Sequence, residues 1–158
     1  MRKRFATELH KHMKADERIV FVTADLGYGL ADQIRADFPD RFINTGAAEQ
    51  CAVGVGVGLA LSGKIPIVYS ITPFLLWRAA ETIRLYINHE KIPVKLVGSG
   101  RKNDYKHDGF SHFAGDDKKL LECWPNIDAR WPSCADVIPI IVKEMLYNEK
   151  PYYLNLKR

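Results

Sequence analysis

The segment from Arg41 to Ala60 reads RFINTGAAEQCAVGVGVGLA and contains a single acidic residue, Glu49. Its first four residues, 41–44, have the short pattern of a strand, and residues 48–62 have the small, apolar composition of a buried helix. A strand followed directly by a helix is the repeating unit of α/β folds. The segment therefore indicates the fold class, and it raises the question of what one acid does at the start of an apolar helix.

The rest of the chain repeats this alternation of strand and helix. The expected strands are 19–22, 41–44, 65–70, 94–97, 127–129 and 152–156, and the expected helices are 2–16, a short one ending at 37, 48–62, 74–89, 117–123 and 135–148. Such alternation predicts a mostly parallel sheet with helices on both faces. We therefore expect residues 1–158 to form a single three-layer α/β/α domain around a six-stranded sheet.

The composition excludes several classes of protein. Apolar residues make up 47% of the chain and charged residues 27%, as in ordinary globular proteins, and the net charge of +4 is spread along the sequence. We therefore expect no nucleic-acid partner and, without a long apolar run, no membrane span. Three widely spaced cysteines, Cys51, Cys123 and Cys134, form neither a zinc pattern nor a disulfide framework, which indicates a cytoplasmic protein.

Two glycine patterns follow the acid. Residues 58–64, GLALSGK, match most of a phosphate-binding P-loop, but Ile65 replaces the magnesium-binding Ser or Thr, so we interpret Gly63 as a helix cap. Gly54, Gly56 and Gly58 do not have the spacing of the dinucleotide-binding motif. Glycine inside a helix costs about 1 kcal/mol relative to alanine. We therefore expect close packing there, against a neighbouring helix or another subunit.

A long polar loop, residues 98–116, lies between a strand's carboxyl end and the next helix, where open α/β sheets bind their ligands. Its Asp108, Ser111 and His112 do not indicate a hydrolase triad, because the chain has no G-x-S-x-G motif. Glu49 has two interpretations. It is either an ordinary acid in the first turn of a helix, or a carboxyl group in an apolar site, where loss of water favours sharing a proton.

Several short motifs occur in a recognisable order. They are ADL at 24–26, FPDRF at 38–42, GAAEQ at 46–50, RA at 78–79 and DGFSH at 108–112. Together they resemble the pyrimidine-binding domain of transketolase and of 1-deoxy-xylulose-5-phosphate synthase. The resemblance covers nearly the whole chain, and it implies the thiamine-diphosphate pyrimidine-binding fold for residues 1–158.

The resemblance implies that thiamine diphosphate is the cofactor. In the family, the glutamate at the Glu49 position hydrogen-bonds a nitrogen of the pyrimidine ring and so helps to remove the thiazolium proton. Asp25 matches an acid near the cofactor, and Phe74 and Trp77 fall where the family has an aromatic cage around the pyrimidine. The opening question then has an expected answer: Glu49 is a cofactor-binding and catalytic residue.

The resemblance also implies substrate contacts. Asp108 and His112 match residues that contact ketose hydroxyl groups, His112 with a catalytic role, and Arg2 matches an arginine that binds the sugar phosphate. Two further phosphate-binding positions of the family are occupied by Gly29 and Trp131. These departures predict weaker selection for phosphorylated sugars, or a bulkier acceptor that lies over Trp131.

The resemblance implies a partner subunit as well. The family's diphosphate-binding module carries G-D-G followed by Asn and holds Mg²⁺ or Ca²⁺. This sequence has no such motif, so we expect it to bind no metal itself and to share the cofactor with a diphosphate-binding subunit. Self-association through the glycine-rich helix would then give a heterotetramer.

The implied reaction is transketolase-like. The enzyme would transfer a two-carbon ketol or acyl unit from a ketose or 2-oxo acid to an aldehyde acceptor, and this chain would be active only with its partner. Two alternatives remain open: a subunit of a 2-oxo-acid decarboxylase, against which the Asp108–His112 motif argues, and a non-catalytic scaffold or regulatory module derived from the fold.

Overall fold

The computed structural model describes residues 1–158, and its centre is a six-stranded sheet in which every neighbouring pair of strands is parallel. The strands lie in the order β2-β1-β3-β4-β6-β5. Their bounds are β1 Ile19–Thr23, β2 Phe42–Asn44, β3 Ile65–Ile71, β4 Lys95–Ser99, β5 Asp128–Arg130 and β6 Tyr152–Leu156. The mostly parallel sheet expected from the sequence is thus entirely parallel.

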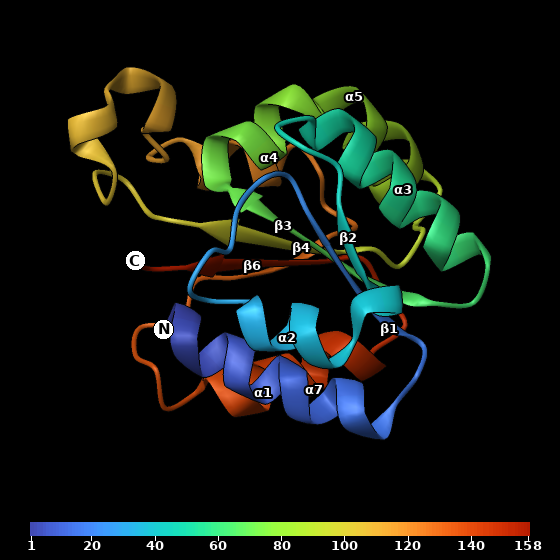
Figure 1. The fold of residues 1–158 in the computed structure, drawn as a ribbon. Coiled ribbons are helices and arrows are strands. Elements are labelled where there is room, and N and C mark those ends of the chain that lie inside the picture. Colours follow the sequence, from blue (N-terminus) through green and yellow to red (C-terminus); the bar gives the residue numbers. More distant parts are fainter.

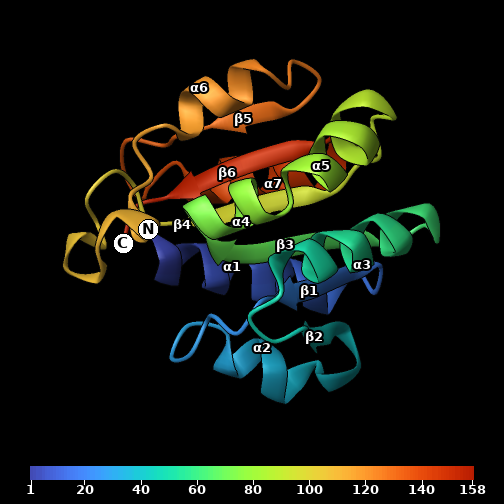
Figure 2. The ribbon, with the colours of Figure 1, turned by 90° about the horizontal axis from the view of Figure 1, so that it is seen from above.

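Helices cover both faces of the sheet, so the fold has three layers (Figure 1). The first layer consists of α1 (Arg2–Ala15), α2 (Asp32–Asp37) and α7 (Ile138–Tyr147). The opposite layer consists of α3 (Glu49–Leu61), α4 (Thr72–Arg78), α5 (Ala80–Thr82) and α6 (Asp117–Glu122). Seen from above, α3 and α4 lie over the middle strands and α6 lies at the β5 edge (Figure 2).

The alternation of side chains along β1 explains why its sequence is apolar throughout. Val20 and Val22 pack with the helices of the α3 layer, whereas Ile19 and Phe21 pack with those of the α1 layer. Because both faces of the strand are buried, neither set of alternating positions can be polar. The sequence pattern therefore predicted the three layers correctly.

One expected helix, residues 74–89, is divided into three pieces. It begins earlier, as α4 at Thr72, because Pro73 occupies the first turn, where proline is favoured. It then continues through α5 into a π-helical segment, Ile83–His89. Similarly, α7 begins at Ile138 rather than at residue 135, with Pro139 in its first turn. Apolar periodicity alone does not report such breaks.

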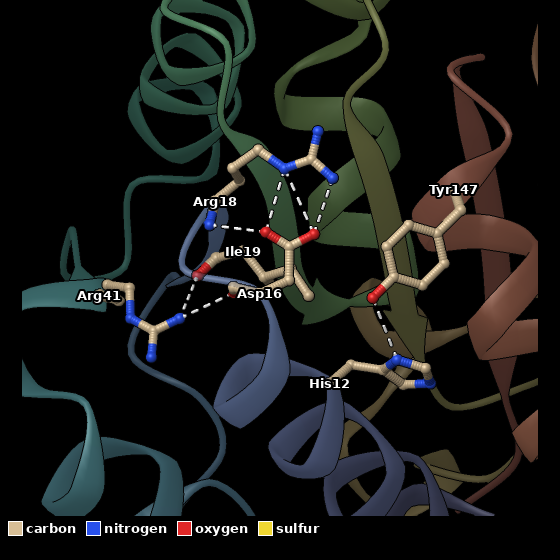
Figure 3. Close-up of polar contacts among 6 residues, drawn as sticks. All are labelled: His12, Asp16, Arg18, Ile19, Arg41 and Tyr147. Atoms are coloured by element: carbon tan, nitrogen blue, oxygen red, sulfur yellow. Dashed lines mark hydrogen bonds and ion pairs between the residues drawn. The ribbon is translucent and has the colours of Figure 1, made fainter.

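At the amino edge of the sheet, the turn between α1 and β1 is tied by a cluster of hydrogen bonds (Figure 3). The Asp16 carboxylate accepts from the backbone N, Nε and Nη2 of Arg18, and these bonds hold the pKa of Asp16 below its usual range. Arg41 Nη1 donates to the carbonyl oxygens of Asp16 and Ile19, at 3.1 and 3.4 Å. These contacts stabilise the edge opposite the carboxyl ends of the strands.

A buried lysine begins β4 at the same edge. Lys95 is 1% exposed, and its Nζ donates to Asn148 Oδ1 at 2.9 Å and to the carbonyl oxygen of Lys150. Burial lowers the pKa of Lys95 to about 8. The side chain joins β4 to the turn that precedes β6. No helix of the structure has the length and apolar character needed to cross a membrane.

Candidate functional site

Glu49 is the first residue of α3, and its side chain is buried, with 2% of the residue exposed. Ser70 Oγ donates to Oε1 at 2.9 Å, and Arg78 Nη1 lies 2.7 Å from Oε2. Ser70 comes from β3 and Arg78 from α4, so three elements meet at the carboxylate. A helix dipole stabilises an acid by about 0.3–1 kcal/mol at the surface, which does not offset the cost of burying a charge, so the burial of Glu49 has another cause.

Arg78 connects Glu49 to an aromatic pair. The Arg78 guanidinium lies over the Phe74 ring, 4.0 Å from Cζ to the centroid, and the arginine side chain is 47% exposed. The Phe74 ring in turn meets the His112 ring edge to face, with the centroids 4.7 Å apart. The α4 helix brings Phe74 and Arg78 to the same side because they are four residues apart.

The contacts continue from His112 to the first helix. The His112 ring centroid lies 6.0 Å from that of Tyr105, and the Tyr105 hydroxyl is 2.9 Å from Ser99 Oγ. Arg2 Nη1 donates to the Tyr105 hydroxyl at 3.1 Å. Arg2 therefore belongs to the same assembly as His112, although the two residues are distant in the sequence.

These residues form one continuous row, which we call the Glu49–Arg2 row. Its members are Glu49, Ser70, Arg78, Phe74, His112, Tyr105, Ser99 and Arg2. It lies along the ends of β3 and β4, and carboxyl strand ends are where open α/β sheets place their ligand sites. An acid, a base, hydroxyl groups and two arginines there can bind a polar ligand and move protons.

Three residues predicted for the site do not join the row. Asp25 follows β1 with a positive φ of 52°, and its Oδ1 accepts from the Tyr28 hydroxyl at 2.9 Å. Trp77 is 52% exposed and makes no aromatic or cation–π contact within the chain. Asp108 pairs with its neighbour His107, Nε2 to Oδ2 at 3.2 Å, so it forms no hydrolase triad with His112.

Trp131 and Gly29, which the resemblance places at phosphate-binding positions of the family, differ in their surroundings. Trp131 is held by Asp117, with its Nε1 donating to Oδ2 at 2.7 Å, and its ring meets the Tyr153 ring edge to face. Gly29 has a positive φ of 68° and open space where a side chain would be. Trp131 is therefore fixed in place, whereas Gly29 leaves room.

The three helical glycines have different environments. A Cβ on Gly56 would lie 2.7 Å from Val68 Cγ2, so this glycine lets α3 approach the sheet closely. A Cβ on Gly54 or Gly58 would meet nothing within 4 Å, and both glycines line an open cavity of about 1070 Å³ beside Glu49 and Tyr86. Internal packing therefore explains Gly56 but not Gly54 or Gly58. Gly63, which has a φ of 78°, ends the helix, as the sequence predicted.

Sequence reasoning assigned no site role to Arg78, Ser70 or Tyr105. For Arg78 a signal existed, because it lies four residues after Phe74 on the same predicted helix. Ser70 and Tyr105 have no comparable signal, since their contacts join different elements. Among residues 1–158, no three His, Cys, Asp or Glu side chains lie together so as to hold a metal ion.

Comparison with known families and proteins gives consistent matches. The family model "Transketolase, pyrimidine binding domain" matches residues 1–158. A putative transketolase C-terminal section from Methanocaldococcus jannaschii is 31% identical over 100% of this chain and 50% of its own length. A 6-deoxy-6-sulfo-D-fructose transketolase subunit from a Clostridium species is 28% identical over 100% of this chain and 49% of its own length.

A solved structure is also similar. It is described as a split-gene transketolase, an inactive beta4 tetramer, and it is 33% identical with a TM-score of 0.86. The match covers 99% of this chain and 51% of that one. The chain thus spans about half the length of the relatives that it matches.

Proposed function

This chain belongs to the transketolase pyrimidine-binding domain family, and we propose that it acts as the pyrimidine-binding subunit of a split, thiamine-diphosphate-dependent transketolase-like enzyme. Residues 1–158 would serve as one such module. The observation that carries the proposal is the buried Glu49 carboxylate at the carboxyl edge of the sheet, reached by Ser70 and Arg78.

The surroundings of Glu49 suit the pyrimidine ring of thiamine diphosphate. One carboxylate oxygen is held by the buried Ser70, while the other pairs with the half-exposed Arg78, so a ring nitrogen can compete for it from the open side. The adjacent cavity, about 1070 Å³, has the size of a cofactor site. Phe74 supplies an aromatic surface beside the carboxylate. The residues present therefore fit the cofactor.

Each residue of the row then has a role. Thiamine diphosphate, when bound, supplies a carbon nucleophile and an electron sink. Glu49 would hold a proton at the pyrimidine ring nitrogen, and Ser70 would keep its carboxylate in position. Phe74 would contact the ring, whereas Trp77 and Asp25 are proposed near the cofactor from their family positions alone.

The other end of the row would bind the sugar. His112 is near Phe74 and would exchange protons with substrate oxygens, and Asp108 would bind a hydroxyl group from the same loop. Arg2, held by Tyr105, would bind an anionic end of the substrate. A ketose or 2-oxo acid would be the donor and an aldehyde the acceptor of the two-carbon unit.

The diphosphate and its Mg²⁺ or Ca²⁺ would be held by a partner subunit. The split-gene transketolase of known structure is described as an inactive beta4 tetramer, which supports self-association and dependence on a second subunit. The exposed glycines Gly54 and Gly58 give a partner access to the α3 backbone, and a heterotetramer is the simplest assembly. Three free, exposed cysteines support a reducing, cytoplasmic location.

A non-catalytic module is the second candidate, and the Arg78–Glu49 ion pair favours it, since the pair occupies the carboxylate. The two functions are distinguished by co-expressing the chain with its diphosphate-binding partner and measuring thiamine diphosphate binding and ketol transfer. The enzyme proposal predicts binding and turnover only in the complex. A stable complex that binds no thiamine diphosphate would favour the non-catalytic module.

A further inference from the structure

Asn155, near the carboxyl end of β6, lies at the centre of a buried polar cluster. The residue is 0% exposed, and its side-chain nitrogen contacts four oxygen atoms. These are Thr72 Oγ1 at 3.1 Å, the carbonyl oxygen of Gly100 at 3.2 Å, Asp117 Oδ2 at 3.1 Å and the Tyr153 hydroxyl at 3.0 Å. With Arg101, they form what we call the Asn155 cluster, which has no member in common with the Glu49–Arg2 row.

The neighbours of Asn155 fix the orientation of its amide. The Gly100 carbonyl and the Asp117 carboxylate only accept hydrogen bonds, whereas the Arg101 guanidinium only donates them. Asn155 Nδ2 faces the two acceptors, and Oδ1 accepts from Arg101 Nε at 2.7 Å. The backbone carbonyl oxygen of Asn155 accepts from Arg101 Nη2, also at 2.7 Å. Because the position needs two N–H donors and one acceptor, neither a leucine nor an aspartate side chain can replace the amide.

The Asn155 cluster joins three segments of the chain to β6. Thr72 is the first residue of α4, Asp117 is the first residue of α6, and Gly100 begins the loop that follows β4. Thr72 Oγ1 also donates to the Gly100 carbonyl oxygen at 2.8 Å, so α4 and the loop are joined directly. None of the buried side-chain atoms without a partner belongs to the cluster. A buried network whose members are all paired is rigid.

Gly98 in β4 leaves space for the cluster. A Cβ at this position would lie 2.6 Å from Thr72 Oγ1 and 2.9 Å from the Tyr153 hydroxyl, which is closer than real Cβ contacts. Glycine weakens a strand and often marks the close approach of another group. The cluster therefore explains why a central strand contains glycine here.

The segments that the cluster joins also carry the aromatic part of the Glu49–Arg2 row. Phe74 lies two residues after Thr72, and His112 belongs to the loop that begins at Gly100. The Phe74 and His112 rings meet with their centroids 4.7 Å apart. In the same loop, the Tyr105 ring packs against Gly100, where a Cβ would find no room. The separation of α4 and the loop therefore sets the contact between Phe74 and His112.

We propose that Asn155 is a positioning residue of the site. Together with Thr72, it holds the start of α4 and the loop at the separation that brings His112 against Phe74. The inference rests on the proposed function, in which His112 exchanges protons with the substrate beside the aromatic surface of Phe74. A displacement of about 1 Å at a reacting group can cost about 100-fold in rate.

NMR spectroscopy of the full chain measures the contact without any cofactor. The ring current of Phe74 shifts the ring protons of His112, so Phe74→Leu defines the shift that the contact produces. We expect Thr72→Val, which keeps the shape of the side chain but lacks its hydroxyl, to lose at least half of this shift. Asn155→Leu should do the same, whereas Thr72→Ser, which retains the hydroxyl, should keep the shift. The signals of His112 are identified by their absence in His112→Gln.

Val142→Ala is the control for an effect on stability alone, because Val142 is buried in α7 on the opposite face of the sheet. It should lower Tm and leave the His112 shift unchanged. The inference is overturned by a folded Thr72→Val chain with the wild-type shift, by an equal loss in Val142→Ala, or by a loss in Thr72→Ser. A Thr72→Val chain that does not fold would also overturn it, since the cluster would then serve the whole domain. If only Asn155→Leu fails to fold, the two Thr72 variants decide.

Activity gives a separate readout in the reconstituted complex. Thr72→Val and Asn155→Leu should lower kcat/KM by about 10- to 100-fold, and Thr72→Ser should recover most of the loss. Wild-type turnover in a variant that has lost the His112 shift would show that the contact is not needed. If the wild-type complex has no ketol transfer at all, the proposed function fails, while the NMR result still shows whether Asn155 and Thr72 hold the two rings together.

Discussion

Arg78 Nη1 lies 2.7 Å from Glu49 Oε2, so that the last residue of α4 is paired with the first residue of α3. The two members differ in exposure, because the Glu49 side chain is 2% exposed and the Arg78 side chain 47%. The buried carboxylate is thus balanced by a cation that remains accessible to solvent and to ligands. A ligand can therefore displace Arg78 from the Glu49 carboxylate without any movement of the buried core.

Glu49→Gln should leave the fold intact and abolish most of the activity. Glutamine is nearly isosteric and can still accept from Ser70, but it cannot share a proton with a ring nitrogen. We expect a rate loss of about 10²–10⁴-fold in the reconstituted complex. The measurement is the exchange rate of the thiazolium proton, together with Tm.

Glu81→Gln is the matched control, since Glu81 is an exposed first-turn acid of α5. It should leave the exchange rate of the thiazolium proton unchanged. It should alter the free energy of unfolding by no more than the roughly 0.3–1 kcal/mol that a helix-terminus charge contributes. Normal proton exchange in a folded Glu49→Gln complex would remove Glu49 from the mechanism.

Arg78→Met should destabilise the isolated chain. The variant leaves Oε2 of the buried Glu49 without its charged partner, and an unsatisfied buried acceptor typically costs about 1–3 kcal/mol. Because Arg78 is half exposed and water can partly replace it, we expect about 1 kcal/mol. Urea unfolding measures the difference, and Arg78→Lys should recover part of it. An unchanged urea midpoint would show that the ion pair contributes nothing to stability.

Arg2→Ala should reduce binding of small phosphorylated sugars. In the proposed site, Arg2 would be the remaining cation of the family's phosphate site, since Trp131 and Gly29 occupy the other two positions implied by the resemblance. We therefore expect the wild type to prefer phosphorylated over unphosphorylated small acceptors by about 10- to 150-fold in kcat/KM, roughly the contribution of one charged hydrogen bond. Competition between the two acceptors measures this preference. A preference above a thousandfold that Arg2→Ala abolishes would mean that one arginine suffices.

Lys95 should make the chain more stable as pH rises above 8. The pKa of Lys95 is about 8 in the folded chain, against 10.5 without burial, so between these values the unfolded chain binds more protons. As far as Lys95 is concerned, the chain is most stable above pH 10.5, where this side chain is neutral in both the folded and the unfolded state. The stability decreases as pH falls from 10.5 to 8, because the unfolded chain takes up the proton first. We expect a gain of about 1–2 kcal/mol between pH 7.5 and 9.5. Urea unfolding at the two pH values should show no such gain for Lys95→Met. An equal increase in the free energy of unfolding in both proteins would refute the lowered pKa of Lys95.

Alanine substitutions in α3 should have opposite effects. Gly54→Ala meets open space and should stabilise the isolated chain by up to about 1 kcal/mol, because alanine favours helices. Gly56→Ala should destabilise it, since the new Cβ would press against Val68. Thermal unfolding measures both variants.

The same glycine also tests the proposed assembly. If partners approach the α3 backbone at Gly54, Gly54→Leu should fold normally and fail to form the hetero-oligomer, which light scattering on the co-expressed subunits detects. A Gly54→Leu chain that assembles as the wild type does would exclude this surface.

Much of the fold could be predicted from local sequence. The apolar run of β1 and the periodicity of α1 depend on neighbouring residues, so these two elements agree with the structure to within about two residues. The division of the helix after Pro73 could not be predicted, because α and π turns have similar apolar periodicity over so few residues.

The candidate site was only partly predictable. Glu49 and His112 stood out by position, and the structure places both in one row, joined through Arg78 and Phe74. Asp108 stood out equally but pairs with His107. Sequence position indicates which loop a residue occupies, whereas its rotamer and partner depend on the elements that pack around that loop.

The sequence alone determined the alternation of strands and helices, and with it the carboxyl edge where a ligand site belongs, because those features follow from the periodicity of neighbouring residues. Only the tertiary structure decided that Arg78 meets Glu49, that Arg2 meets Tyr105, and that residues following β4, β5 and β6 line one cavity. These contacts join residues far apart in the chain, and their free energy depends on distance and burial, which no local pattern records.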